Sequence, residues 1–164
     1  MKLIVGLGNP GEKYKNNRHN VGYMLIDYLI NELRITDYGL KPYKTDCYMN
    51  ESGKFVKKLI RNSQSAIEQL IIVHDDLDIP LGKFKIQKGT GPQLHNGIES
   101  VENQLKTKNF WRIRIGVDNR PKTGWIDGET YVLQNFRLEE KEIVNQLFIS
   151  VLDRIKRLLS TFAD

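Results

Sequence analysis

Short blocks of hydrophobic and polar residues follow one another along the chain and predict strands and helices in turn. Apolar runs at 3–5 and 70–73 contain mainly β-branched residues or leucine, which is typical of buried strands. Segments 82–87 and 111–117 alternate between apolar and polar residues. This alternation predicts two further strands.

Four other segments carry apolar residues at intervals of three and four, the spacing of an amphipathic helix. The expected helices cover residues 20–33, 52–61, 95–105 and 139–162, with Leu33 and Phe162 closing the first and the last. Residues 34–50 fit neither pattern, and we assign them no element. Because strands and helices take turns without a linker or repeat, we expect residues 1–164 to form one α/β domain. Its sheet should be mixed but mostly parallel, with helices on both faces.

The first strand is followed by Gly6-Leu7-Gly8-Asn9-Pro10-Gly11, which fits the dinucleotide-binding pattern G-x-G-x-x-G. That pattern requires its last glycine to open a helix whose N-terminus faces a pyrophosphate. Residues 12–20 are polar without an apolar face, so the loop leads into a second loop that carries His19. We therefore interpret the glycines as turn formers that bring Asn9 and His19 to the strand end. An NAD-dependent dehydrogenase is an alternative that rests on the glycines alone.

Polar side chains gather at three predicted element ends: Asn9 with His19, the segment 74–78, and His95 with Asn96. Such ends converge at one edge of a parallel sheet, which predicts a shared cleft. A neutral imidazole accepts a proton from water near pH 7, and a carboxylate on its other nitrogen fixes the tautomer. His19 with Asp75 would meet this need. For any one histidine alone, a structural or solvated role is the alternative.

The sequence lacks the motif of a protein nucleophile or of a metal site. There is no G-x-S-x-G segment, and the single cysteine, Cys47, has no local signature of a thiol enzyme. Water is therefore the expected attacking group. Short ligand spacings such as H-E-x-x-H are also missing, so we predict neither metal nor cofactor. Ligands that assemble from distant loops are the alternative.

The charge balance permits a polyanionic partner. Lys and Arg outnumber Asp and Glu by 25 to 20, a net charge of +5. No run of about 18 apolar residues and no leader pattern is present, which predicts a cytoplasmic protein without membrane contact. Basic residues cluster in four places, for which ordinary solvated faces are the alternative: Lys54, Lys57, Lys58 and Arg61; Lys83, Lys85 and Lys88; Arg112 and Arg114; Arg120 and Lys122.

Taken in order, these motifs resemble the bacterial peptidyl-tRNA hydrolase family. The resemblance is carried by segments 3–11, 14, 18–22, 48–53, 74–82, 95–97, 112–116 and 131–133. It implies an enzyme that hydrolyses the ester between a peptide and the terminal ribose of tRNA, recycling tRNA from abandoned translation. By analogy, His19 would be the general base and Asp75 its partner, while Asn9 would read the blocked peptide end.

The resemblance also implies the residues that bind substrate. Tyr14, Tyr48, Met49, Asn50, His95 and Asn96 match positions that contact peptide or tRNA. We expect Lys83, Lys85, Arg112 and Arg114 to hold the acceptor stem of peptidyl-tRNA, and the protein to be a monomer.

This chain departs from the family pattern in three places. The segment between Leu33 and Met49 is short where a strand pair usually intervenes, which predicts a smaller or rebuilt sheet. Gln93-Leu94 replaces the usual Gly-Gly, which would narrow the approach of substrate to the backbone, and Asp118-Asn119 replaces a glycine. A non-catalytic RNA-binding protein on the same scaffold is therefore the alternative function.

Overall fold

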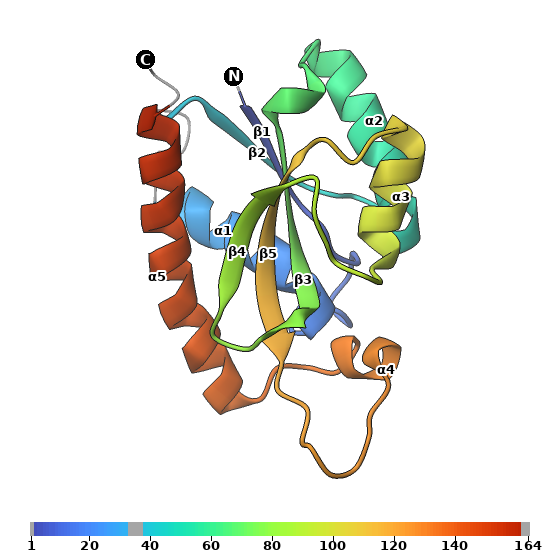
Figure 1. Ribbon diagram of the computed structural model, residues 1–164, viewed down its shortest axis with the longest axis vertical. Coiled ribbons are helices and arrows are strands. Elements are labelled where there is room, and N and C mark those ends of the chain that lie inside the picture. Colours follow the sequence, from blue (N-terminus) through green and yellow to red (C-terminus); the bar gives the residue numbers. More distant parts are fainter. Residues whose placement is uncertain (1, 33–37, 162–164) are drawn as a thin grey trace.

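The computed structural model describes residues 2–32 and 38–161, and a five-stranded sheet forms its centre (Figure 1). The strands are β1 (Lys2–Gly6), β2 (Leu40–Lys44), β3 (Leu70–Pro80), β4 (Phe84–Lys88) and β5 (Trp111–Asp118). Their spatial order is β2-β1-β3-β5-β4, in which only β4 runs antiparallel to its neighbour. The predicted single α/β domain with a mostly parallel sheet is confirmed.

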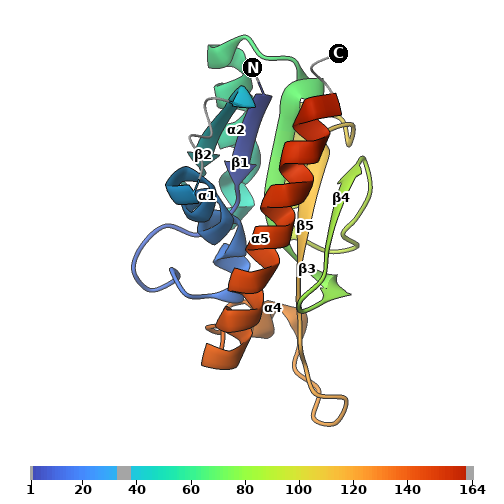
Figure 2. The same ribbon diagram turned by 90° about the vertical axis from the view of Figure 1, so that its left-hand side faces the viewer.

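Helices cover both faces of this sheet. They are α1 (Val21–Glu32), α2 (Ser52–Ser63), α3 (Asn96–Leu105), α4 (Gly128–Val132) and α5 (Leu138–Thr161). Helices α1 and α5 pack on one face, and α2 and α3 pack on the other (Figures 1 and 2). Leu33 and Phe162, at the ends of two predicted helices, lie outside the described residues. Within the described ranges, no helix combines the length and apolar character needed to cross a membrane.

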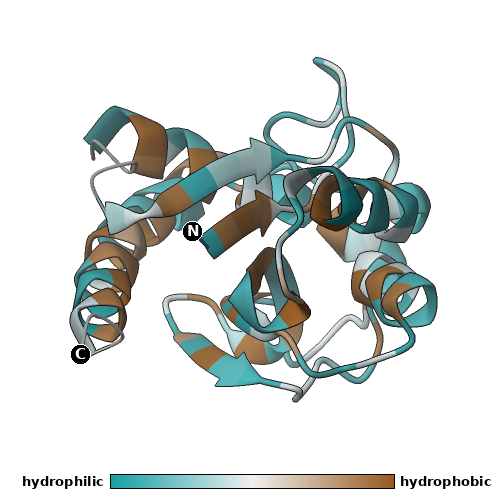
Figure 3. Ribbon diagram, turned by 90° about the horizontal axis from the view of Figure 1, so that it is seen from above, coloured by the Kyte–Doolittle hydropathy of each residue, from teal (hydrophilic) through white to brown (hydrophobic). Residues whose placement is uncertain are grey.

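The alternation of side chains along the strands divides the apolar interior into two cores. Leu3 and Val5 of β1 contribute to the core under α2 and α3, whereas Ile4 points to the core under α1 and α5. Strands buried on both faces need apolar residues at nearly every position. The strand that starts at the N-terminus is accordingly hydrophobic along most of its length (Figure 3).

Strand β3 is longer than the sequence predicts. We expected the acidic segment 74–78 to be a loop, but the ladder with β5 continues through His74↔Arg114 and Asp75↔Ile115 to Asp76↔Gly116. An irregularity follows before Pro80 pairs with Asp118. Asp75 is thus fixed by a central strand.

Strand β2 occupies part of the segment to which we assigned no element. It pairs in parallel with β1 at the edge of the sheet, from Lys2↔Leu40 to Gly6↔Lys44. Pro42 and two lysines conceal it in the sequence, because prolines and charges are features of edge strands as much as of loops.

The glycine loop differs from our interpretation. Only Gly11 has a left-handed backbone, with φ of 102°. Gly6 and Gly8 instead allow close packing, because a Cβ at Gly6 would meet the backbone of Gly22 at 2.5 Å and one at Gly8 would meet the Tyr23 ring at 2.8 Å. No helix opens at Gly11, since α1 begins only at Val21. The dehydrogenase alternative therefore lacks the helix that its phosphate site requires.

Candidate active site

A cleft of about 490 Å³ opens beside the carboxyl ends of β1 and β3. Its polar lining comes from the loops and strand ends that the sequence singled out, and its apolar lining comes from β3, α4 and the loop before α3. The lining residues are Asn9, His19, Tyr48, Met49, Asn50, Asp75, Leu77, Leu94, His95, Asn96, Gly128, Glu129, Val132 and Leu133.

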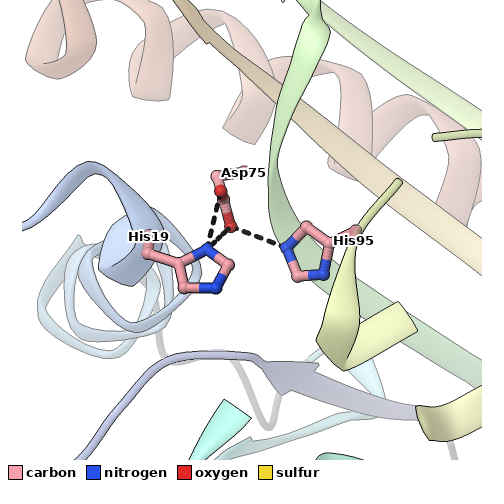
Figure 4. A group of neighbouring side chains, drawn as sticks. All are labelled: His19, Asp75 and His95. Atoms are coloured by element: carbon pink, nitrogen blue, oxygen red, sulfur yellow. Dashed lines mark hydrogen bonds and ion pairs between the residues drawn. The ribbon is translucent and has the colours of Figure 1, made fainter. Parts of the chain in front are cut away.

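His19 and Asp75 form a buried pair within this cleft (Figure 4). His19 lies in a 3₁₀ turn, Arg18–Asn20, and its Nδ1 is 2.9 and 2.8 Å from the two carboxylate oxygens of Asp75. Burial alone would lower the pKa of His19, but the charge and hydrogen bond of Asp75 outweigh it, so the pKa is raised above its ordinary value. Because Nδ1–H donates to the carboxylate, Nε2 carries the lone pair and points away from Asp75.

His95 is a second hydrogen-bond donor to the same carboxylate. Its Nε2 is 2.8 Å from Asp75 Oδ1, and its Nδ1 accepts from the backbone N–H groups of Gly97 and Ile98 at 3.1 and 3.2 Å. His95 thereby caps helix α3, which fixes its tautomer with the proton on Nε2. We predicted a substrate contact for His95, but both ring nitrogens are bonded within the protein. In the structure its side chain supports the Asp75 carboxylate.

The two imidazoles together keep Asp75 ionised. Burial would raise the pKa of this carboxyl, whereas His19 and His95 lower it well below its usual range. Neighbouring His74 is fully buried, and burial lowers its pKa to about 3, so it is neutral near pH 7. Its Nδ1 is 2.7 Å from the backbone carbonyl of Asp75.

Asn9 presents hydrogen-bond donors to the cleft. Its side-chain oxygen accepts from the Met49 N–H at 2.8 Å, and its backbone N–H and carbonyl bind the Asn20 carboxamide, each at 2.9 Å. With its oxygen engaged, the NH₂ group of Asn9 is the part that can bind a ligand. An acceptor such as a carbonyl oxygen fits this group, and an ammonium does not.

Arg18, adjacent to His19, anchors the α4 wall of the cleft. It is 3% exposed, pairs with Glu140 of α5 at 2.7 Å, and donates to the carbonyl of Tyr131 in α4 at 3.1 Å. Glu140 also accepts from Asn119, which in turn donates to the Tyr131 hydroxyl. The departure Asp118-Asn119 therefore helps to hold α4 in place.

The predicted aromatic and amide residues lie at the rim. Tyr48, with 56% of its surface exposed, lines the cleft beside Asn50, and Asn96 lies there also. Tyr14 is not among the lining residues, but its ring packs edge-on against Tyr48 with centroids 6.4 Å apart. Tyr14 thus contacts a residue of the rim without lining the cleft itself.

The structure divides the predicted acceptor-stem residues. Lys83 and Lys85 are exposed, but Arg112 and Arg114 are buried, at 1% and 6% exposure, and pair with Glu102 and Asp76. We expected both arginines to contact tRNA, but acidic side chains of α3 and β3 pair with them. Arg112 and Arg114 therefore form ion pairs inside the protein, unlike the exposed phosphate contacts that we predicted.

Sequence reasoning missed the apolar lining of the cleft. Leu77, Leu94, Val132 and Leu133 contribute to it, together with Gly128 and Glu129 at the start of α4. Helix α4 has a recognisable signal, because Asp127 accepts from the Thr130 N–H at 2.9 Å as an N-cap. Leu94, from the Gln93-Leu94 departure, is 89% exposed at the rim.

Ligand atoms of His19, Asp75 and His95 lie within 4.8 Å of one another, a grouping able to hold a metal ion. A shared ion would need His95 Nε2 without its proton. The proton would then move to Nδ1, which could no longer accept hydrogen bonds from the N–H groups of Gly97 and Ile98. The cap of α3 therefore opposes metal binding by all three side chains.

The fold and site together define an α/β protein with a buried histidine–aspartate pair in an open cleft, an arrangement suited to hydrolysis by activated water. A family model described as peptidyl-tRNA hydrolase matches residues 3–164. The chain belongs to the peptidyl-tRNA hydrolase family, which confirms the predicted membership.

Individual relatives agree with this result. The chain is 39% identical to a peptidyl-tRNA hydrolase of Mycoplasmopsis synoviae, over 93% of this chain and 87% of that protein. It is 37% identical to one of Thermodesulfovibrio yellowstonii, over 94% of this chain and 90% of that protein. The crystal structure of peptidyl-tRNA hydrolase from Acinetobacter baumannii superimposes with a TM-score of 0.81 at 28% identity, covering 99% and 90% of the two chains.

Proposed function

We propose that this chain hydrolyses the ester between the peptide and tRNA of peptidyl-tRNA, with water activated by His19 and without a metal. The observation that carries the proposal is the His19–Asp75 pair at 2.8 Å in a cleft, within a chain of this family. Release of the peptide from tRNA would recycle tRNA from abandoned translation in the cytoplasm.

In the proposed reaction, Nε2 of His19 takes a proton from a water molecule as that water attacks the ester carbonyl. The imidazolium that forms is stabilised by the ionised Asp75. The Asp75 carboxylate keeps its orientation toward His19 because His95 Nε2 donates a hydrogen bond to its Oδ1 at 2.8 Å. The proton then passes from His19 to the ribose oxygen as the ester bond breaks.

Asn9 would select substrates with a blocked amino end. Its NH₂ group donates to the acyl carbonyl of a peptide, whereas a free aminoacyl ester presents an ammonium that cannot accept. A site built to pair a buried polar group strongly rejects a ligand that leaves the group unpaired. The exposed amides of Asn50 and Asn96 would bind other parts of the substrate, and exposed Lys83 and Lys85 would contact tRNA.

The test compares N-acetylated lysyl-tRNA with free lysyl-tRNA, each with and without a chelator. We expect the blocked substrate to be cleaved and the free one to react at least about 10²-fold more slowly. The chelator should leave both rates unchanged. Equal cleavage of the two esters would refute the role of Asn9, and loss of activity that added metal restores would refute metal-free chemistry. No cleavage of either ester would favour the non-catalytic alternative.

A further inference from the structure

Trp125 exposes 85% of its surface in the loop between β5 and α4. This loop extends beyond the remainder of the molecule, at the lower end of Figure 1. An indole is the largest apolar side chain and gains most when another flat group covers it. The hydrolytic chemistry of the cleft makes no use of Trp125.

The loop places this indole close to the cleft. Trp125 is three positions before Gly128, which lines the cleft, so their Cα atoms lie within about 11 Å of each other. The base of the loop is held on both sides. Arg120 donates to the carbonyl of Ile126 at 3.2 Å and pairs with Asp118 at 2.8 Å, and Asp127 caps α4.

Positive charge accompanies the indole. Lys122 lies in the same loop, and Lys83 lies at the same end of the sheet, where its carbonyl accepts from the Gly116 N–H at 2.9 Å. Both lysines are exposed, and neither has an ion-pair partner among the described residues. The nearby acidic side chains are Asp118, which pairs with Arg120, Asp127, which caps α4, and Glu129 on the cleft wall. An exposed aromatic ring on a surface that also carries exposed cations is a pattern that binds single-stranded nucleic acid.

We propose that Trp125 is a stacking platform for a base in the single-stranded 3′ end of tRNA. The proposal rests on the proposed function, because an ester at His19 requires the last nucleotides of the tRNA to leave through the mouth of the cleft. Trp125 lies within about 11 Å of Gly128 in the cleft wall, which places its indole where those nucleotides would pass. The lysines would then contact the adjoining phosphates.

Fluorescence tests the contact without relying on hydrolysis. The chain has two tryptophans, and Trp111 begins β5 at the opposite end of that strand, so a Trp111→Phe background leaves Trp125 as the sole indole. A short oligoribonucleotide with the 3′-terminal sequence of tRNA should quench this emission saturably. Increasing salt should weaken the binding, because phosphate contacts contribute. A fluorescence signal that does not respond to the oligonucleotide overturns the proposal.

Substitutions separate stacking from simple apolar contact. Trp125→Phe keeps a ring and should raise KM for N-acetylated lysyl-tRNA by less than about threefold. Trp125→Leu keeps apolar surface only, and its KM should rise about 5- to 150-fold, the equivalent of one lost base stack, with kcat unchanged within about twofold.

Leu138→Ala is the matched control, because Leu138 is 86% exposed and does not line the cleft. Its KM should match that of the wild type. If Trp125→Leu behaves like Trp125→Phe, the indole contacts an apolar group such as a peptide side chain, and the stacking proposal is wrong. Normal hydrolysis with unquenched fluorescence would sink this proposal and leave the proposed function intact.

Discussion

Replacing His19 by alanine should slow the hydrolysis of N-acetylated lysyl-tRNA by about 10²- to 10⁴-fold, the usual effect of losing a general base. Two imidazoles line the described cleft, and His19 is the one with a ring nitrogen that is not bonded within the protein, because both nitrogens of His95 are bonded. His74 is fully buried and does not line the cleft. Substrate affinity should change by less than about threefold, since tRNA is expected to bind outside the pair. Single-turnover rates measure the chemical step, and competition by deacylated tRNA measures affinity.

Cys47→Ala provides the control for this experiment. Cys47 is half-buried and does not line the cleft, and burial raises the pKa of its thiol, which disfavours the thiolate. Its loss should leave the rate unchanged. Near-normal turnover by a folded His19→Ala protein would contradict the catalytic assignment, and a large loss in Cys47→Ala would point to a thiol nucleophile.

Arg18→Met should lower the free energy of unfolding by about 3–5 kcal/mol, because it leaves the Glu140 carboxylate buried without its cation. Arg18 and Glu140 have side-chain exposures of only 3% and 1%, and the guanidinium also lies 3.9 Å from the centre of the Tyr131 ring. Domains of this kind are stable by about 5–15 kcal/mol in total, so the loss is a large share. Urea denaturation measures it, and KM should rise as the α4 wall loosens.

An exposed ion pair gives the matched comparison. Lys44 and Asp27 are 2.8 Å apart with side chains 43% and 54% exposed, and Lys44→Met should cost less than about 1 kcal/mol. The double variant Arg18→Met with Glu140→Met should lose less stability than the two single losses combined, because no unpaired charge is left. A cost below about 1 kcal/mol for Arg18→Met would show that the pair does not anchor α4.

Much of the fold can be predicted from local pattern, and the failures have physical reasons. Apolar runs and helical spacing locate β1, the start of β3 and the long helices, because burial of one or both faces of an element requires apolar residues at regular spacing. Strand β2 has no such periodic pattern, because it contains Pro42 and two lysines and lies at a sheet edge, which needs little apolar surface. Helix α4 spans only Gly128–Val132, too short for a periodic signal.

The site was predictable where strand ends determine it. Asn9 and His19 follow β1 and Asp75 lies within β3, where an apolar run gives way to polar residues, and the carboxyl ends of parallel strands converge. The partners of His95 and Arg114 were not predictable, because they come from distant segments of the chain. His95 meets Asp75 across 20 residues of sequence, and Arg114 meets Asp76 across 38. Only the packed structure shows that these polar side chains are internal.

The central claim is that His19, held by Asp75, activates the water that cleaves peptidyl-tRNA. Its most direct test is the pH dependence of single-turnover hydrolysis by the wild type and by Asp75→Asn. Protonated His19 cannot accept a proton, so the wild-type rate should rise with pH through a pKa above the ordinary 6.5 and then level off. In Asp75→Asn the rate should be far lower and its rise should move to lower pH, because burial then acts alone to lower the pKa of His19. A wild-type rate that is flat across this range, or the same profile in both proteins, would contradict the claim.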